Sequence, residues 1–178
     1  MPTLIDGDGI GQDDWQYVDP AITDPLTLAG HRIVVPAAYA IAHAETVFAA
    51  ERDIGVRLPG DAELENIESL LGRVALIAVD FPAFNDGRGL SLAVLLRTRC
   101  GFRGELRAVG DVHTDMMHYL RRCGFDSYLL PDGRNPQTAL DALSSLTDFY
   151  QGSVAQPLPA YRRVGRGGGV ARLRSHLG

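Results

Sequence analysis

Acidic side chains follow the ends of two apolar runs that are expected to be strands. Asp80 comes directly after residues 74–79, and Gly110 and Asp111 follow residues 105–109. Carboxylates at the ends of neighbouring parallel strands can approach within a few ångströms, where they could bind Mg²⁺ or act as an acid and a base. The alternative, which we favour for Asp111, is that its carboxylate caps the helix that follows.

The loop after Asp80 carries a second polar group, formed by Asp86, Gly87 and Arg88. Arg88 precedes Gly89 at the expected start of a helix. There, a guanidinium and the positive end of the helix could together bind an oxyanion such as sulfite, sulfate or phosphate. The alternative is a salt bridge from Arg88 to Asp86 or Asp80. Asp86 could equally form an Asx turn with Gly87.

Several kinds of chemistry are excluded by residue types that are absent or badly spaced. All 17 basic residues are arginine, so the chain has no lysine for a Schiff base, a pyridoxal phosphate anchor or a Walker A loop. His113 and His118 are five positions apart, not the four that place two imidazoles on one helix face. Cys100 and Cys123 form no Cys-x-x-Cys motif, which excludes a zinc ribbon or an iron–sulfur cluster held by one chain. We predict no metal site, and the residues identify no cofactor.

Five units, each a short β-branched run, a turn and a segment with helical apolar spacing, must position these residues. The runs expected to be strands are residues 32–35, 54–58, 74–79, 105–109 and 127–130. The helices expected after them pass through residues 39–48, 64–71, 91–100, 114–123 and 136–150. Asp61 and Asn135 are expected to cap two of these helices. Gly72 and Gly124 are expected to end two of them.

Alternating strands and helices predict parallel strands joined by right-handed crossovers, with helices on both faces of the sheet. We predict an open, five-stranded parallel α/β sheet of flavodoxin-like order 2-1-3-4-5, with the apolar run 74–79 in its middle. The alternative is part of a βα barrel completed by a partner chain, because a closed eight-stranded barrel typically needs about 250 residues. Ligands of open parallel sheets bind beyond the carboxyl ends of the strands, so the expected site follows the third and fourth strands.

Composition divides the 178 residues into three parts. Residues 31–150 form the predicted α/β domain, residues 1–30 a cap segment, and residues 151–178 a disordered tail rich in Arg and Gly. Residues 1–150 hold 12 arginines and 22 acidic residues, whereas the tail holds five arginines and no acid. The tail lacks the interleaved aromatic residues that stack on bases, and no apolar run is long enough to span a bilayer. We expect a cytoplasmic protein without a membrane partner, and we favour a solvated tail over the alternative of a tail that binds nucleic acid.

Five segments of the chain carry a resemblance to a known family. They read DDWQYVD, IGVRLP, DFPAFNDGRGLSLAVLLR, GFRGELRAVGDV and YLRRCGFDSY. In this order, over about residues 13–150, they resemble the uncharacterised bacterial family called domain of unknown function 934. Members of that family are commonly encoded beside assimilatory sulfite reductase and are labelled probable oxidoreductases involved in sulfite reduction. No catalytic residue is established for the family.

The resemblance implies an accessory protein of assimilatory sulfate and sulfite reduction, with sulfite reductase or another sulfur-assimilation enzyme as its partner. The alternative is an enzyme or sensor that binds a small oxyanion or a sulfur metabolite at the ends of the third and fourth strands. The candidate ligand-binding residues are Asp80, Asp86, Gly87, Arg88, Gly110, Asp111 and Arg121.

Overall fold

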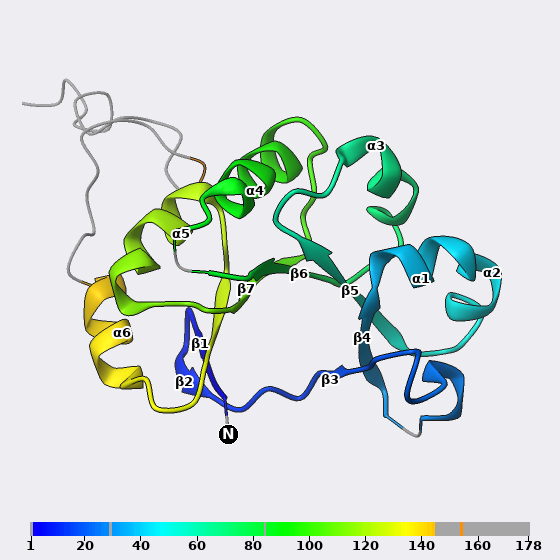
Figure 1. Cartoon of the computed structure of the whole chain (residues 1–178), viewed down its shortest axis with the longest axis horizontal. Coiled ribbons are helices and arrows are strands. Elements are labelled where there is room, and N and C mark those ends of the chain that lie inside the picture. The colour runs from blue at the N-terminus through cyan, green and yellow to red at the C-terminus, as the bar shows by residue number, and fades with distance from the viewer. Residues whose placement is uncertain (1, 29, 84, 145–153, 155–178) are drawn as a thin grey trace, which may run out of the picture.

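A curled, open sheet of eight strands runs through the part of the chain that the computed structural model describes, which is residues 2–28, 30–83, 85–144 and 154 (Figure 1). Its strand order is β2-β1-β8-β7-β6-β5-β4-β3. The strands are β1 (Thr3–Asp6), β2 (Gly9–Gly11), β3 (Gln16–Tyr17), β4 (Arg32–Pro36), β5 (Asp53–Pro59), β6 (Leu76–Phe81), β7 (Glu105–Gly110) and β8 (Ser127–Leu130). Strands β3 to β8 are parallel, and the β1–β2 hairpin adds two antiparallel strands at the β8 edge.

The parallel strands follow one another in chain order, so the predicted flavodoxin-like order 2-1-3-4-5 is wrong. Each crossover returns to the next strand along, and right-handed crossovers of this kind leave all the helices on one face of the sheet. Figure 1 shows the helices along the outside of the curve, as in one half of a βα barrel. The sheet is therefore a half-barrel, and five parallel strands with helices on both faces do not describe it.

Short helices follow the strands of the half-barrel. They are α1 (Ala37–Ala42), α2 (Ala44–Val47), α3 (Leu64–Ile67), α4 (Arg88–Thr98), α5 (Met117–Cys123) and α6 (Pro136–Ser144), with 3₁₀ turns at Pro25–Thr27, Glu68–Leu70 and Thr114–Met116. Two of the predicted signals are confirmed. Gly124 ends α5 with a φ of 101°, and Asn135 Oδ1 accepts a hydrogen bond from the backbone N–H of Gln137 at 2.9 Å at the start of α6.

Two predicted caps are wrong, and two predictions fall outside the described residues. The 3₁₀ turn at Thr114–Met116 has His113 as its cap residue, without a side-chain cap, and the Asp111 carboxylate contacts His113 and Arg134 instead. Helix α3 begins after Glu63, without a side-chain cap, and the carboxylate of Asp61 pairs with Arg88 instead. The predicted continuation of α6 from residue 145 to residue 150 lies outside the described residues. So does the predicted tail, except for Val154.

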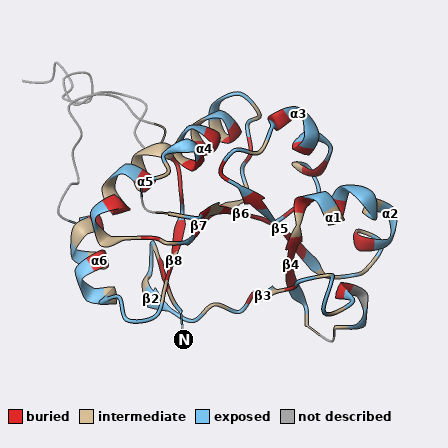
Figure 2. Cartoon of the chain, in the orientation of Figure 1, coloured by how far each residue is buried: buried red, intermediate tan, exposed pale blue. Residues whose placement is uncertain are grey.

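Side chains alternate between the two faces of the sheet, and each face has its own core. The outer face packs against the helices through Ile33, Val35, Ile54, Val56, Leu58, Ile77, Val79, Leu106, Ala108, Tyr128 and Leu130. The inner face carries a smaller core of Trp15, Val34, Leu76, Ala78 and Val109. Figure 2 shows buried residues along the strands and on the sides of the helices that face them. As its apolar sequence predicted, β6 is buried on both faces, because Leu76, Ile77, Ala78 and Val79 are all 0% exposed.

Residues 12–17 cross the inner face of the half-barrel and fill it with Trp15. The Trp15 side chain is buried, with 8% of the residue exposed. Gly55 leaves the space for the indole, because a Cβ at Gly55 would lie 3.2 Å from Trp15 Cζ3 and 2.9 Å from Leu76 Cδ2. The inner core is thus covered by this chain's own N-terminal segment.

Candidate functional site

The carboxyl ends of β5 and β6 bring Arg57 and Asp80 together on the inner side of the sheet. Arg57 Nη2 donates a hydrogen bond to Asp80 Oδ2 at 2.7 Å. The pair is accessible to solvent, since 48% of the Arg57 side chain and 27% of the Asp80 side chain are exposed. A guanidinium has five N–H donors, so one hydrogen bond to Asp80 leaves Arg57 able to bind an anion as well.

Gly110 allows the end of β7 to close against Asp80. Its φ is 92°, which favours glycine, and a Cβ at this position would lie 2.7 Å from Asp80 Oδ1 and against the carbonyl oxygen of Phe81. The backbone N–H of Asp111 donates to that same carbonyl at 2.8 Å. Asp80 and Asp111 therefore lie next to each other at the edge of the sheet where the parallel strands end, as their positions after adjacent strands predicted. This edge, with Arg57, Asp80, Gly110 and Asp111, is called the carboxyl rim below.

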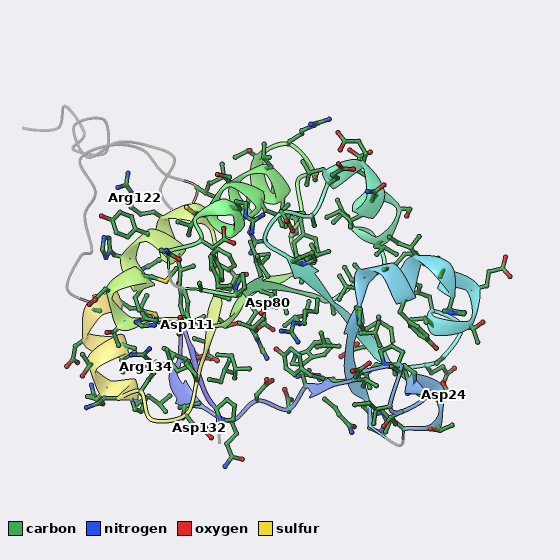
Figure 3. All side chains as sticks on the ribbon, in the orientation of Figure 1. Asp24, Asp80, Asp111, Arg122, Asp132 and Arg134 are labelled. Atoms are coloured by element: carbon green, nitrogen blue, oxygen red, sulfur yellow. The ribbon has the colours of Figure 1, made fainter. Side chains whose placement is uncertain are left out.

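Asp111, His113 and Arg134 form a second polar group on this rim, between β7 and the loop after β8. His113 Nε2 lies 2.9 Å from Asp111 Oδ1 and 2.6 Å from Arg134 Nη2. One ring nitrogen cannot donate to a carboxylate and accept from a guanidinium at once, so the tautomer of His113 decides which of the two Nε2 bonds. Figure 3 shows Asp80, Asp111 and Arg134 in that order, from the middle of the molecule towards α6.

Arg88 is held by two carboxylates at the start of α4. Its Nη2 donates to Asp86 Oδ2 at 2.6 Å, and its Nη1 donates to Asp61 Oδ2 at 2.7 Å. Asp86 Oδ1 also accepts the backbone N–H of Arg88 at 3.1 Å, which forms an Asx turn around Gly87. The side-chain and backbone hydrogen bonds from Arg88 lower the pKa of Asp86 to about 2. The predicted alternative, a salt bridge from Arg88 to Asp86, is therefore confirmed.

Arg121 lies away from the other candidate residues. It belongs to the last turn of α5, close to the start of β8, whereas the rim lies at the carboxyl ends of the strands. Its Nη1 donates to the backbone oxygen of Leu143 in α6 at 2.8 Å. The hollow it lines, of about 570 Å³, is separate from the rim and is formed with Asp6, Gly7, Phe125, Asp126, Tyr128, Leu140, Leu143 and Ser144.

A pocket of about 310 Å³ opens on the inner face beside Arg57. It is lined by Tyr17, Val18, Asp19, Val34, Pro36 and Arg57. The Tyr17 hydroxyl lies 3.4 Å from Arg107 Nη1, and burial raises the pKa of this phenol. Strand β3, from the N-terminal part of the chain, thus supplies one wall of a pocket that β4 and β5 alone would leave open.

A buried arginine anchors this wall. Only 2% of the Arg107 side chain is exposed, and it forms ion pairs with Asp13 at 2.5 Å and with Glu105 at 2.7 Å. Burial acts against the charge of Arg107, but Tyr17, Asp13 and Glu105 outweigh it and raise the pKa of the guanidinium. Residues 12–17 are therefore tied to β7 by a compensated buried charge.

The thiols and the remaining acids do not add to this site. In the described part of the chain, no group of three or more His, Cys, Asp or Glu side chains is arranged to hold a metal ion. Cys100 and Cys123 are free thiols, and burial raises the pKa of each. Among the described helices, none has the length and apolar character needed to cross a membrane.

Three rim residues were not among the sequence candidates: Arg57, His113 and Arg134. A signal for Arg57 was present in the segment IGVRLP, where apolar residues alternate with Gly55 and Arg57. Such alternation indicates a strand with one polar face. Arg134 had no comparable signal, because it lies in a loop. The loop comes beside His113 because β7 and β8 are parallel neighbours.

The curled sheet, its outer layer of helices and its polar carboxyl rim define an α/β protein of half-barrel form. A family model described as "Bacterial protein of unknown function (DUF934)" matches residues 55–161, which is more than half of the chain. The chain belongs to this family, as its motifs indicated. No curated protein and no solved structure shows significant similarity to it.

Proposed function

We propose that this protein binds a small oxyanion or an anionic sulfur metabolite at the carboxyl rim of its half-barrel. We further propose that this binding contributes to assimilatory sulfate and sulfite reduction. The observation that carries the ligand proposal is the solvent-accessible Arg57–Asp80 pair at the ends of two central strands. Active sites of βα barrels lie at this end of the strands. The pathway rests on the resemblance of the motifs to proteins encoded beside sulfite reductase.

The charges of the rim suit an oxyanion. Arg57 and Arg134 present guanidinium groups, which bind tetrahedral oxyanions through several N–H donors at once. Asp80 and Asp111 each contact one of these groups and hold it in place, at 2.7 Å and 3.6 Å respectively.

The test is thermal unfolding of the full chain with sulfite, sulfate, phosphate and adenylyl sulfate. A ligand present at 100 times its Kd stabilises a protein by about 2.7 kcal/mol, which raises the Tm of a chain of this length by about 5–11 °C. Arg57→Gln is expected to remove the shift. Arg88→Gln is the matched control and is expected to keep it, since Arg88 is held by Asp86 and Asp61.

Two outcomes contradict the proposal. A shift lost in Arg88→Gln but kept in Arg57→Gln would place the ligand at the start of α4 instead of at the rim. The absence of any shift across the panel would reject a ligand site for these anions.

We also propose that the protein is an accessory protein that contacts sulfite reductase or another sulfur-assimilation enzyme. Support comes from the excess of acids, with 22 acidic residues and 12 arginines in residues 1–150, which suits a basic partner surface. Helices α4 and α5 also expose Leu95 and Tyr119, of which 41% and 53% are accessible.

Tagged full-length protein is expected to co-purify with a sulfite-reducing enzyme. Leu95→Asp with Tyr119→Asp is expected to break the complex. Ile22→Asp, at a residue that is 83% exposed on the loop after β3, serves as the control and is expected to leave it intact. Co-purification that is unaffected by the double substitution would move the contact away from α4 and α5.

A further inference from the structure

We propose that the pocket beside Arg57 holds the organic body of the ligand, so that the site selects an organic anion with a ring-sized apolar body and a singly charged, sulfonate-like head. This inference rests on the proposed function, because it assigns the ligand class for the same rim. The charged head would bind at the guanidinium of Arg57, which is called the head position below. An inorganic oxyanion would then be a weak binder that occupies only this position.

The strand register places the pocket and the head position next to each other. Tyr17 pairs with Val34 across β3 and β4, and Pro36 pairs with Arg57 across β4 and β5. Residues paired in this way point to the same face of a sheet. Tyr17, Val34 and Pro36 therefore form a continuous inner surface that ends at the guanidinium of Arg57.

The size of the pocket exceeds what a small oxyanion needs. Its volume is about 310 Å³. An apolar cavity of about 150 Å³ can accommodate benzene. One ring therefore fits beside Arg57, with room left for its head group.

The lining suits an apolar body. Val18, Val34 and Pro36 are apolar, and Tyr17 contributes an aromatic ring. Transfer of apolar ligand surface from water onto such a lining is favourable, whereas a bare sulfate gains nothing from it.

The charges around the pocket favour one negative charge on the ligand. Arg57 is the one cation among the six residues that line it, and Asp80 already neutralises part of its charge. The second carboxylate, Asp19, accepts the backbone N–H of Ala21 at 2.9 Å and would repel a second ligand charge. A sulfonate is therefore a better head group than a phosphate dianion.

The walls of the pocket are already ordered. Val34 is 1% exposed and Val18 is 7% exposed, and the backbone N–H of Val18 donates to the carbonyl oxygen of Val34 at 2.9 Å. Tyr17 is held through its hydroxyl by Arg107. A ligand entering this pocket has little chain entropy to overcome, because the wall does not need to form on binding.

Calorimetric titration of the full chain with methanesulfonate and with benzenesulfonate, at one ionic strength, tests the inference. The two probes share a head group and differ in the apolar body. We expect benzenesulfonate to bind at least about tenfold more tightly, which corresponds to about 1.4 kcal/mol and to the burial of about 55 Å² of apolar surface. We also expect it to bind more tightly than phenyl phosphate.

Three variants locate the effect. Arg57→Gln is expected to weaken both sulfonates, because they share the head position. Tyr17→Ala is expected to remove the preference for benzenesulfonate and to leave the methanesulfonate affinity unchanged. Tyr17→Phe keeps the ring and is expected to retain the preference, and if Tyr17→Ala fails to fold, shifts of the Val18 and Val34 amide resonances on titration of the wild-type chain locate the ring.

The outcomes separate this inference from the proposed function. If both sulfonates bind equally and both depend on Arg57, the anion site stands and the organic subsite is rejected. If benzenesulfonate binds more tightly but the Val18 and Val34 amides do not respond, the ring lies elsewhere and the inference also fails. If neither sulfonate binds while sulfite does, the rim site stands without this ligand class.

Discussion

Removal of the Asp13 carboxylate is expected to destabilise the protein far more than removal of its neighbour Asp14. Asp13 is 13% exposed and pairs with Arg107, which is 2% exposed. Asp14 is 66% exposed and pairs with Arg32, which is 45% exposed. The two carboxylates are adjacent in the sequence and each forms an ion pair with an arginine, so Asp14→Ala is a matched control for Asp13→Ala.

The expected magnitudes follow from burial. Breaking a buried ion pair by removing one partner costs about 3–5 kcal/mol, because the other charge stays buried without compensation. Glu105 remains 2.7 Å from Arg107, so we expect the lower end of this range, about 3 kcal/mol, for Asp13→Ala. An exposed pair contributes about 0–1 kcal/mol, which sets the expectation for Asp14→Ala.

Urea unfolding followed by fluorescence measures both values. Trp15 is the one tryptophan of the chain and lies two residues after Asp13 on the same segment, so its emission reports directly on residues 12–17. Circular dichroism gives the unfolding of the helices for comparison. An added 0.5 M salt, at which screening extends over only a few ångströms, is expected to reduce the effect of Asp14→Ala but not that of Asp13→Ala.

Equal costs for the two variants, or a cost below about 1 kcal/mol for Asp13→Ala, would refute the reasoning. A double-mutant cycle with Arg107→Met provides a second check, because residues in one ion pair are expected to show a coupling of about 0.5–3 kcal/mol.

Three further predictions concern single positions. Gly110→Ala is expected to destabilise the fold by about 1–3 kcal/mol and to weaken anion binding at the rim. The reason is that the φ of 92° is strained for alanine and that the new Cβ meets Phe81 and Asp80. Unchanged unfolding in urea would contradict this prediction. The pKa of the Asp86 carboxyl is expected to be about 2 by NMR and to move back towards 3.8 in Arg88→Ala. Because folding lowers this pKa, the extra stability of the wild type over Asp86→Asn is expected to be present above pH 3.8 and to be lost as the pH falls through 2. Cys123 is expected to react more slowly with iodoacetamide at pH 8 than free cysteine does, because burial raises its pKa, and a faster reaction would show that the thiol is activated.

Much of the local structure could be predicted from the sequence. The predicted run 127–130 is β8 (Ser127–Leu130), and the other four predicted runs overlap β4 to β7. The Asn135 cap and the Gly124 helix end were readable because each depends on residues within a few positions along the chain. The Asp61 cap failed because a residue of another segment, Arg88, competes for its carboxylate.

The candidate site was predicted only in part. Asp80, Gly110 and Asp111 come together because parallel neighbours align their carboxyl ends, and this could be inferred once the strands were recognised. Asp86 and Arg88 bind each other, and Arg121 lies near the start of β8. These three residues belong to the family motifs, but the fold does not place them at the carboxyl rim with Asp80.

The sequence by itself determined the five strands β4 to β8, the approximate positions of the helices that follow them, where two of the helices begin or end, and that β6 is buried on both faces. It did not predict β1 and β2. Those properties depend on the period of apolar residues and on turn chemistry, which act over a few neighbouring positions. Only the tertiary structure decided the order of the strands and the face on which the helices lie. It also decided that Asp13 meets Arg107, 94 positions further along the chain. No local pattern encodes such a contact. The direction in which successive strands are added along the sheet, and the position of a distant segment over the inner face, are set by the packing of the whole sheet.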